Sequence, residues 1–191
     1  MIDNSIPYIP VVMRREPGLA LPAWPLPEGF SYQMYQPGLE KDWARIEAAA
    51  GEFECEMEAL LYYQKAFLPY SEELPRRCIF IKAPDGELVG TATAWWDYNG
   101  QRRHPLVHFV AVKPNYQGKG LGKAITAEVI RLMDAVDGDS VFFLCTQTTS
   151  HKAIRIYERA GFYITNEKGV LGRPNDQYQE AIDLLASLCN M

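Results

Sequence analysis

The sequence predicts an α/β fold: a mixed central sheet, mostly antiparallel with one parallel strand-helix-strand crossover, and helices on both faces. Three observations predict it. Two β-rich runs at residues 78–96 flank the turn Asp85-Gly86, which is a hairpin signal. An amphipathic helical pattern separates two buried apolar runs at 107–112 and 141–144, which favours a parallel crossover. Other helical patterns precede and follow this unit.

Length and charge limit the class of protein. The chain has 191 residues, 48% of them hydrophobic, and 19 Lys and Arg against 24 Asp and Glu give a net charge of −5. This composition predicts one globular domain that holds its core without disulfides or metals. Because phosphate neutralisation needs clustered Lys and Arg, the acidic balance predicts no nucleic-acid partner and no anionic membrane partner.

The cysteines and the N-terminus predict a cytoplasmic protein. The four cysteines lie far apart, with no Cys-x-x-Cys pair and no zinc-type His spacing, so we expect reduced thiols and no metal site. The start lacks a basic segment followed by an apolar run, and no stretch approaches eighteen uncharged apolar residues. We therefore expect neither a signal peptide nor a transmembrane helix.

Residues 1–29 are expected to form a proline-rich arm ahead of a single domain at 30–191. The arm holds six of the 13 prolines, so we expect an extended segment with no long helix and no central strand. Its apolar side chains predict docking on the core or on a second copy of the chain, which would make a homodimer. They are Tyr8, Ile9, Val11, Val12 and Trp24.

The first half of the domain predicts a strand, two helices and the hairpin. Residues 30–36 alternate polar with apolar or aromatic side chains, as in a strand. Residues 39–50 and 59–67 are rich in helix formers and end at Gly51 and Pro69. The hairpin strands then follow at 78–81 and 88–96.

The second half predicts the crossover and two more helices. A buried strand at 107–112 is followed by an apolar stripe that begins at Leu121 and stops at Gly138, and by the buried strand at 141–144. Thr149 or Ser150 can cap the next helix, which Gly161 closes before Phe162-Tyr163-Ile164. A last amphipathic helix is predicted at 176–188.

A glycine-rich loop opens the crossover helix. In Gln117-Gly118-Lys119-Gly120-Leu121-Gly122-Lys123, glycines leave backbone N–H groups uncovered where the helix dipole is positive, which favours a phosphate. A Walker A loop needs Ser or Thr after its Gly-Lys, where this chain has Ala124. The dinucleotide pattern needs glycine at the position of Lys123. A turn without a ligand is the alternative.

The segment Gln117-x-x-Gly120-x-Gly122 resembles the coenzyme A loop of the GNAT superfamily of N-acetyltransferases. In that family the loop amides bind the pyrophosphate of acetyl-CoA, and the preceding strand contacts its pantetheine arm. The resemblance implies a GNAT-like sheet and acetyl-CoA as the donor. It also implies that the pyrophosphate is held by Gln117, Gly118, Lys119, Gly120, Gly122 and Lys123, and that Val110 and Val112 line the arm.

A second segment strengthens the resemblance. Ser150-x-x-Ala153-x-x-x-Tyr157-x-x-x-Gly161-Phe162 is similar to the family's Asn-x-x-Ala-x-x-x-Tyr-x-x-x-Gly-Phe segment. Ser150 replaces the usual Asn at a cofactor-binding position. Together the two segments place the resemblance over residues 30–164, so the arm and the last helix lie outside it.

The resemblance nominates Tyr157 as the general acid beside the CoA sulfur; a core tyrosine is the alternative. His108 is the first candidate for the base, because it is the titratable side chain of the strand next to the thioester, with an ordinary pKa near 6.5. Strand alternation predicts that it shares a face with Val110 and Val112. The rival base is a carboxylate from the cluster Glu52, Glu54, Glu56 and Glu58, which otherwise forms a solvated face.

Other polar and aromatic residues are weaker candidates. The acceptor wall is expected to include Tyr62, Tyr63, Trp95, Trp96 and Asp97, with aromatic core packing as the alternative. An acyl-cysteine intermediate on Cys145 is disfavoured, because no His-paired arrangement is readable. Contacts to the 3′-phosphate of the nucleotide are assigned to Lys152 and Arg155, which otherwise are surface charges.

These residues lead to one expected activity and two alternatives. We expect an acetyl-CoA-dependent N-acetyltransferase that moves an acetyl group to a primary amine of a small molecule or peptide, by direct transfer in a ternary complex. The first alternative is a non-catalytic acyl-CoA-binding sensor or interaction module. The second is the same fold acting with a longer acyl-CoA.

Overall fold

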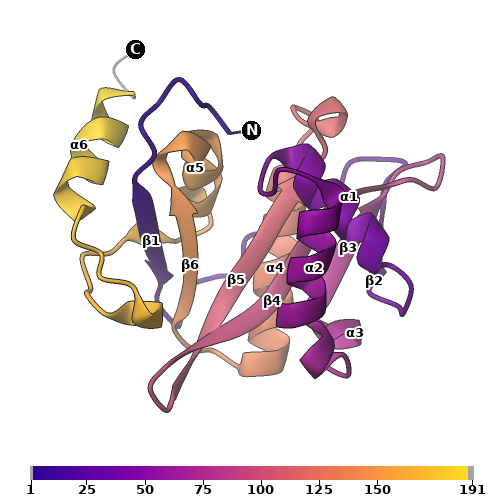
Figure 1. The fold of residues 1–191 in the computed structure, drawn as a ribbon, viewed down its shortest axis with the longest axis horizontal. Coiled ribbons are helices and arrows are strands. Elements are labelled where there is room, and N and C mark those ends of the chain that lie inside the picture. The colour runs from indigo at the N-terminus through magenta and orange to yellow at the C-terminus, as the bar shows by residue number, and fades with distance from the viewer. Residues whose placement is uncertain (1, 189–191) are drawn as a thin grey trace.

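The computed structural model describes residues 2–188 and contains one seven-stranded sheet (Figure 1). Along the sheet the strand order is β2-β3-β4-β5-β6-β1-β7. The strands are β1 (Pro10–Arg15), β2 (Ser31–Met34), β3 (Cys78–Lys82), β4 (Leu88–Asn99), β5 (Arg102–Val112), β6 (Phe142–Gln147) and β7 (Tyr163–Ile164).

The pairing confirms the predicted fold class. β5 and β6 run parallel, joined by the long helix α4 (Leu121–Asp137), and every other neighbouring pair in the sheet is antiparallel. The hairpin β3-β4 turns at Asp85-Gly86, where Gly86 takes a φ of 92° that favours glycine. The parallel crossover therefore forms where the sequence predicts a strand, a helix and a strand in succession.

The expectation of no central strand in the arm is wrong. β1 lies between β6 and β7 and pairs antiparallel with both. Pro10 stands at the first position of the strand, where proline is tolerated although it has no N–H group to donate. The five residues that follow, Val11 to Arg15, contain no proline. Arg15 is buried and donates from its guanidinium to the backbone carbonyls of Leu19, Ala20 and Ala160. The boundary at residue 29 stays a prediction.

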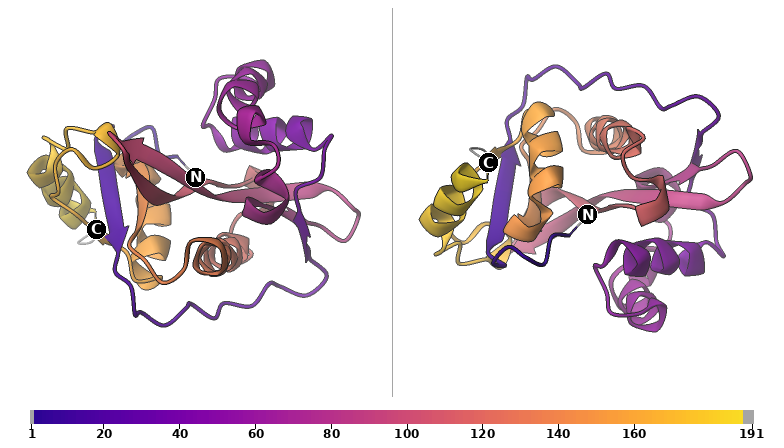
Figure 2. Two further views of the ribbon diagram at one scale, coloured as in Figure 1. Left: turned by 90° about the horizontal axis from the view of Figure 1, so that it is seen from below. Right: turned by 90° about the horizontal axis from the view of Figure 1, so that it is seen from above.

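Helices cover both faces of the sheet, as predicted (Figure 2). The helices α1 (Glu40–Ala50) and α2 (Glu56–Ala66) pack on one face, over an aromatic core. On the other face α4 and α5 (His151–Arg159) cover an aliphatic core. A single turn, α3 (Leu74–Arg77), precedes β3, and α6 (Tyr178–Ser187) packs beside β1. Short 3-10 turns lie at Leu68–Tyr70, Pro114–Tyr116, Thr148–Ser150 and Val170–Gly172.

The arm beyond β1 docks on the core of its own chain. It runs along the α4 side of the molecule before entering β2 (Figure 2). Trp24 and Leu26 pack against the aliphatic core, and the hydroxyl of Tyr32 donates to the carbonyl of Ala124 in α4 at 2.9 Å. Of the two docking surfaces predicted for the arm, the core is the one occupied here.

Cys55, Cys78 and Cys145 are free thiols, and Cys189 lies outside the described residues. Within residues 2–188, no helix has both the length and the apolar character that a bilayer crossing requires.

Glu47 in α1 is fully buried, and neither carboxylate oxygen has a hydrogen-bond partner among the described residues. Burial, and then the nearby charge of Glu52, raise the pKa of Glu47 well above its ordinary 4.5. A carboxyl group whose folded pKa is raised binds its proton more tightly in the folded state. Its contribution to the free energy of unfolding is therefore present below about pH 4.5 and is lost as the pH rises toward and through its folded pKa.

We expect Glu47→Gln, which removes the titration and keeps the shape, to flatten this pH dependence. Urea unfolding at pH 5 and pH 8 measures it: wild type should lose more stability between these values than the variant, by about 1–3 kcal/mol for one uncompensated buried carboxylate. Equal losses in the two proteins would contradict the assignment. Glu40→Gln is the control, because Glu40 is partly exposed and bonded to Tyr35.

Candidate functional site

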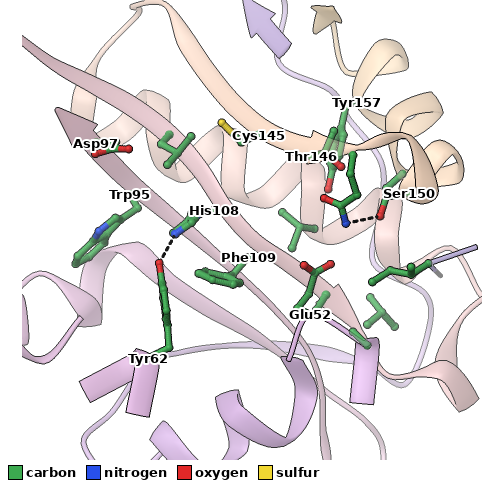
Figure 3. Close-up of a pocket in the computed structure, with 18 of the residues that line it drawn as sticks. Glu52, Tyr62, Trp95, Asp97, His108, Phe109, Cys145, Thr146, Ser150 and Tyr157 are labelled. Atoms are coloured by element: carbon green, nitrogen blue, oxygen red, sulfur yellow. Dashed lines mark hydrogen bonds between the residues drawn. The ribbon is translucent and has the colours of Figure 1, made fainter. Parts of the chain in front are cut away.

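A cavity of about 450 Å³ opens where β5 and β6 separate (Figure 3). The two parallel strands pair only at Leu106 with Phe143 and at Val107 with Leu144. Beyond these pairs each strand continues without the other, and the gap leaves backbone groups of both strands beside the cavity. Six of the predicted site residues line it: His108, Val110, Val112, Gln117, Ser150 and Tyr157.

A β-bulge shapes the β5 wall. In the β4-β5 register, Thr91 pairs with Ala111 and Thr93 with His108, so Phe109 and Val110 together oppose the single residue Ala92. Phe109 takes a positive φ of 49°, which is rare for a residue with a side chain. The extra residue bends the strand and shifts the alternation of faces from that point on.

The bulge overturns the predicted orientation of His108. The rings of His108 and Phe109 lie 4.1 Å apart between centroids, and both approach Phe67 on the α2 side. Val110 and Val112 instead pack against the aliphatic core on the opposite face. Simple alternation put His108 with the two valines; because one residue is inserted between them, it lies on the other face.

An aromatic cluster holds the bulge in place. The buried Trp43 of α1 contacts Phe109 edge to face at 5.0 Å between ring centroids, and it also contacts Phe53 and Tyr62. Phe53 stacks on Phe109 from the loop between α1 and α2. The strained backbone at Phe109 is thus fixed by side chains from both helices of this face.

His108 is neutral in this setting. Burial, and then the positive charge of Arg173, lower the pKa of His108 from 6.5 to about 3. Its Nε2 atom lies 3.3 Å from the hydroxyl oxygen of Tyr62, which comes from α2 (Figure 3). With its pKa far below the ordinary 6.5, His108 can accept a hydrogen bond but binds a proton weakly.

Tyr157 reaches the cavity from α5. Its side chain is only 7% exposed, and within residues 2–188 its hydroxyl makes no hydrogen bond. Burial, and then the charges of Glu52 and Glu47, raise the pKa of Tyr157 above its ordinary value of 10. The phenol is therefore protonated throughout the physiological range, and Tyr157 lines the cavity.

Only Glu52 of the acidic cluster lines the cavity; Glu54, Glu56 and Glu58 do not. It follows Gly51, whose left-handed conformation ends α1 and turns the chain back over the sheet. Glu52 is an exposed residue, and partial desolvation beside the cavity raises the pKa of its carboxyl group. Figure 3 shows Glu52 and Tyr157 directed into the cavity from opposite walls, and the effect of the Glu52 charge on the pKa of Tyr157 agrees with this view.

The glycine loop lies at the end of β5, at the N-terminus of α4. Gly118 and Gly120 take φ values of 78° and 87°, and Gly120 is the N-cap of the helix. A Cβ atom on Gly118 would meet no atom within 4 Å, so the backbone there is open to a ligand. The side chain of Gln117 donates to the carbonyl of Val112 at 2.8 Å and so ties the loop to the strand.

The remaining loop residues lie outside the cavity lining: Gly118, Lys119, Gly120, Gly122 and Lys123. The ammonium of Lys119 lies 5.1 Å from the ring centroid of Tyr116. The predicted loop thus adjoins the cavity through Gln117 and Val112 and does not form its wall. Lys152 and Arg155 also lie outside the lining.

The far wall matches the predicted acceptor side in part. Tyr62, Trp95, Trp96 and Asp97 line the cavity, whereas Tyr63 is fully buried among the core aromatics. On the β6 side the wall includes Ser150, whose hydroxyl accepts a hydrogen bond from Gln147 Nε2 at 3.1 Å.

Cys145 also lines the cavity, on the β6 side. Burial raises the pKa of its thiol, partly offset by Arg173. A thiol kept protonated is a weak nucleophile, so the geometry gives no support to an acyl-cysteine route.

Sequence reasoning missed Arg173, Ile2 and Tyr8, which also line the cavity. Backbone N–H groups of the N-terminal residues make hydrogen bonds that hold them there: Asp3 N–H donates to the carbonyl of Thr149, and Ile9 N–H donates to the hydroxyl of Thr148. Neither the N-terminal residues nor Arg173 belong to a recognisable motif, and both segments lie outside the resemblance. Only the tertiary structure brings Ile2, Tyr8 and Arg173 to this cavity.

Comparison with known proteins gives a consistent picture. The sequence model of the Acetyltransferase (GNAT) family matches residues 39–162. The chain is 30% identical over 157 residues to a mycothiol acetyltransferase of Streptomyces coelicolor, covering 82% of this chain and 50% of that protein. It is 32% identical over 155 residues to the mycothiol acetyltransferase of Actinosynnema mirum, covering 79% and 50%. The chain thus spans about half the length of these curated relatives.

Solved structures share the fold. A GCN5-related N-acetyltransferase from Sphaerobacter thermophilus superimposes with a TM-score of 0.62 at 24% identity, over 83% of this chain and 50% of that one. A GNAT-family acetyltransferase from Colwellia psychrerythraea gives 0.61 at 14% identity, over 86% and 55%. At these identities the likeness shows the fold alone.

Proposed function

Because the chain belongs to the GNAT acetyltransferase family, we propose that it transfers the acetyl group of acetyl-CoA directly to a primary amine of a small molecule, within one ternary complex. The observation that carries this proposal is the cavity between the separated strands. It has the glycine loop adjoining one end, the phenol of Tyr157 and the carboxylate of Glu52 on opposite walls, and an aromatic wall at the other end.

The donor side fits a phosphorylated thioester. The uncovered amides at the N-terminus of α4 can bind a pyrophosphate, since Gly118 and Gly120 leave the backbone open and the helix dipole favours an anion. Gln117, Lys119, Gly122 and Lys123 complete this proposed loop. Val110, Val112 and Ser150 are proposed to line the pantetheine arm, because they border the gap between β5 and β6. The bound donor supplies an activated acetyl carbon.

Two side chains then move the protons. Glu52 accepts the proton that the amine loses as its nitrogen forms the new bond to the acetyl carbon. When the carbon–sulfur bond breaks, Tyr157 donates its phenolic proton to the departing thiolate. The two transfers balance, so the products are an amide and a free thiol, and the two residues exchange their proton with solvent afterwards.

We assign the base to Glu52 in preference to His108. A histidine whose pKa lies near 3 is far too weak to take a proton from an ammonium group, whereas a carboxylate with a raised pKa is a better proton acceptor. In this proposal neutral His108 accepts a hydrogen bond from the amine and so orients it. The carboxylate rival left open by the sequence thus becomes the base.

We expect Glu52→Gln to lower kcat/KM about 10²-fold, as is usual for the loss of one acid–base group. His108→Gln should lower it less and leave the acid limb of the pH profile in place, because His108 does not titrate near neutrality. Steady-state rates from pH 5 to 9 measure both. An acid limb near pH 6.5 that vanishes only in His108→Gln would instead assign the base to His108.

Release of the CoA thiol, measured with acetyl-CoA and a broad panel of primary amines, tests the function. We expect amine-dependent thiol release together with an acetylated amine detected by mass spectrometry. Tight acetyl-CoA binding without thiol release for any amine would favour the sensor. A series of donors from acetyl-CoA to octanoyl-CoA tests the longer acyl chain. Double-reciprocal plots of initial rate that intersect when both substrates are varied support the ternary complex.

A further inference from the structure

Two opposite charges line the cavity without an ion-pair partner. Asp97 on β4 and Arg173, after the turn Val170–Gly172, both border it. Among residues 2–188, neither side chain forms a salt bridge. The two arginines that lie over Trp96 are paired instead: Arg77 bridges to Asp137 at 2.9 Å and Arg103 to Asp137 at 2.8 Å. The two groups are thus available to a ligand.

The Arg173 segment is firmly held. Val170 and Leu171 are buried in a cluster with Val12, Leu106 and Phe143, and this cluster anchors the turn to β1, β5 and β6. Two backbone bonds close the turn, from Gly169 N–H to the carbonyl of Arg173 and from Arg173 N–H to that of Val170. The guanidinium is therefore presented to the cavity from a fixed backbone.

Asp97 is fixed by the sheet. It pairs with His104 in the β4-β5 register, and its Oδ1 atom accepts the backbone N–H of Tyr98 at 2.7 Å. The second carboxylate oxygen has no partner among the described residues. Figure 3 shows the Asp97 and Trp95 side chains on the side of the cavity away from Tyr157.

The two charges act on the same part of the site. Asp97 and Arg173 influence the Tyr62 hydroxyl and the Cys145 thiol in opposite senses, and Arg173 also acts on His108, whereas the charges that act on Tyr157 come from Glu52 and Glu47. One end of the cavity thus carries the acid–base pair, and the other, which extends to His108, carries a fixed anion and a fixed cation. This second end is complementary to a zwitterion.

Resting on the proposed function, we propose that the acceptor is a diamino acid whose α-amino-acid head is held by Asp97 and Arg173 while its side-chain amine reacts. Asp97 binds the α-ammonium group, and Arg173 binds the carboxylate through its two-pronged guanidinium. The head is not the reacting end, because Asp97 lies level with His104, four residues before His108. At about 3.3 Å per residue this is about 13 Å of strand. The side chains of Asp97 and His108 both extend into this distance, so the remaining gap matches the short aliphatic side chain of a diamino acid.

The reaction at the distal end is the transfer described above. The side-chain nitrogen forms the bond to the acetyl carbon, the carbon–sulfur bond breaks, and the head group is unchanged. Trp95 and Trp96 line the same cavity as Asp97 and can cover the methylene groups of such a chain.

Two matched substrate series test the proposal with the full chain. Lysine is compared with cadaverine, which lacks the carboxylate, and with 6-aminohexanoate, which lacks the α-amine; ornithine, putrescine and 5-aminopentanoate form the shorter series. We expect one diamino acid to exceed both of its trimmed partners in kcat/KM by about tenfold to hundredfold, as for the loss of one charged hydrogen-bonding group. The product should be acetylated on the side-chain nitrogen, as read by NMR.

Two variants give separate signatures. Arg173→Gln should abolish the preference over the diamine and keep that over the ω-amino acid, and Asp97→Asn should do the reverse. Arg159→Gln, an exposed arginine of α5 outside the cavity, is the control and should change neither. Trimmed amines that react as well as the diamino acids, or acetylation at the α-nitrogen, overturn this inference while other acetylated amines keep the proposed function. If no amine stimulates release of the CoA thiol, both this inference and the proposed function are overturned.

Discussion

Gly120→Asp is expected to weaken acetyl-CoA binding at least about 100-fold. Gly120 is the N-cap of α4, so a carboxylate there would face the site proposed for the pyrophosphate. Two unit charges about 4 Å apart repel by about 4 kcal/mol near a protein surface, and the new carboxylate would also compete for the helix amides. Isothermal titration calorimetry with acetyl-CoA measures the change in Kd.

Gly120→Asn is the matched control for this variant. Gly120 has a positive φ of 87°, and Asn and Asp tolerate this conformation better than other residues with side chains. A Cβ atom there would meet only Pro27, at 3.8 Å, so either variant has room to fold. We expect the asparagine variant to bind much more tightly than the aspartate variant. Equal affinities for the two, or wild-type affinity for Gly120→Asp, would remove the loop from the donor site.

Tyr157→Phe is expected to lower kcat about 10²-fold with little change in donor affinity. The substitution removes only the hydroxyl, and the ring keeps its place beside Phe162, 6.4 Å away between centroids. Without the phenol, the thiolate must leave unprotonated or take its proton from water. Single-turnover measurements under saturating substrates report the chemical step directly, so slow product release cannot conceal the loss.

Tyr163→Phe is the control for this second prediction. Tyr163 lies in β7, is exposed, and donates its hydroxyl to Glu16 at 2.6 Å, away from the cavity. We expect its turnover to equal that of wild type. If Tyr157→Phe also turns over at the wild-type rate in the single-turnover experiment, Tyr157 is a packing residue of α5 and not the acid.

The electrostatics of the cavity follow one physical rule. Burial disfavours the charged form of every ionisable group, so it raises the pKa of Glu52 and Tyr157 and lowers that of His108. The same desolvation makes the phenol a proton donor, keeps the imidazole neutral and improves the carboxylate as a base. A single environment thus separates the proposed roles of the three side chains.

The elements of the domain could be predicted from local patterns. The helix from Leu121 to Asp137, the hairpin at Asp85-Gly86 and the buried runs on either side of the crossover appear where their periodicity and turn residues indicate. These signals depend on residues near one another in sequence, and the loop at Gln117–Lys123 is of the same kind. The family resemblance was legible for that reason.

The arm shows where local reasoning stops. Its prolines argued against a central strand, yet Val11 to Arg15 pair with β6 and β7. Two strands distant in sequence supply the hydrogen bonds for this pairing, and the burial of Arg15 is satisfied by carbonyls that include Ala160. Propensity alone cannot register partners that lie more than a hundred residues away.

By itself the sequence determined the fold class, the crossover and the position of the glycine-rich loop, because each depends on a short pattern of residues. The tertiary structure alone decided the chemistry of the cavity. One extra residue at Phe109 moved His108 to the other face, and packing chose Glu52 from four similar glutamates. Folding also brought Asp97 and Arg173 to the lining of the same cavity. Orientation and burial, which set these outcomes, arise from contacts between segments far apart in the chain.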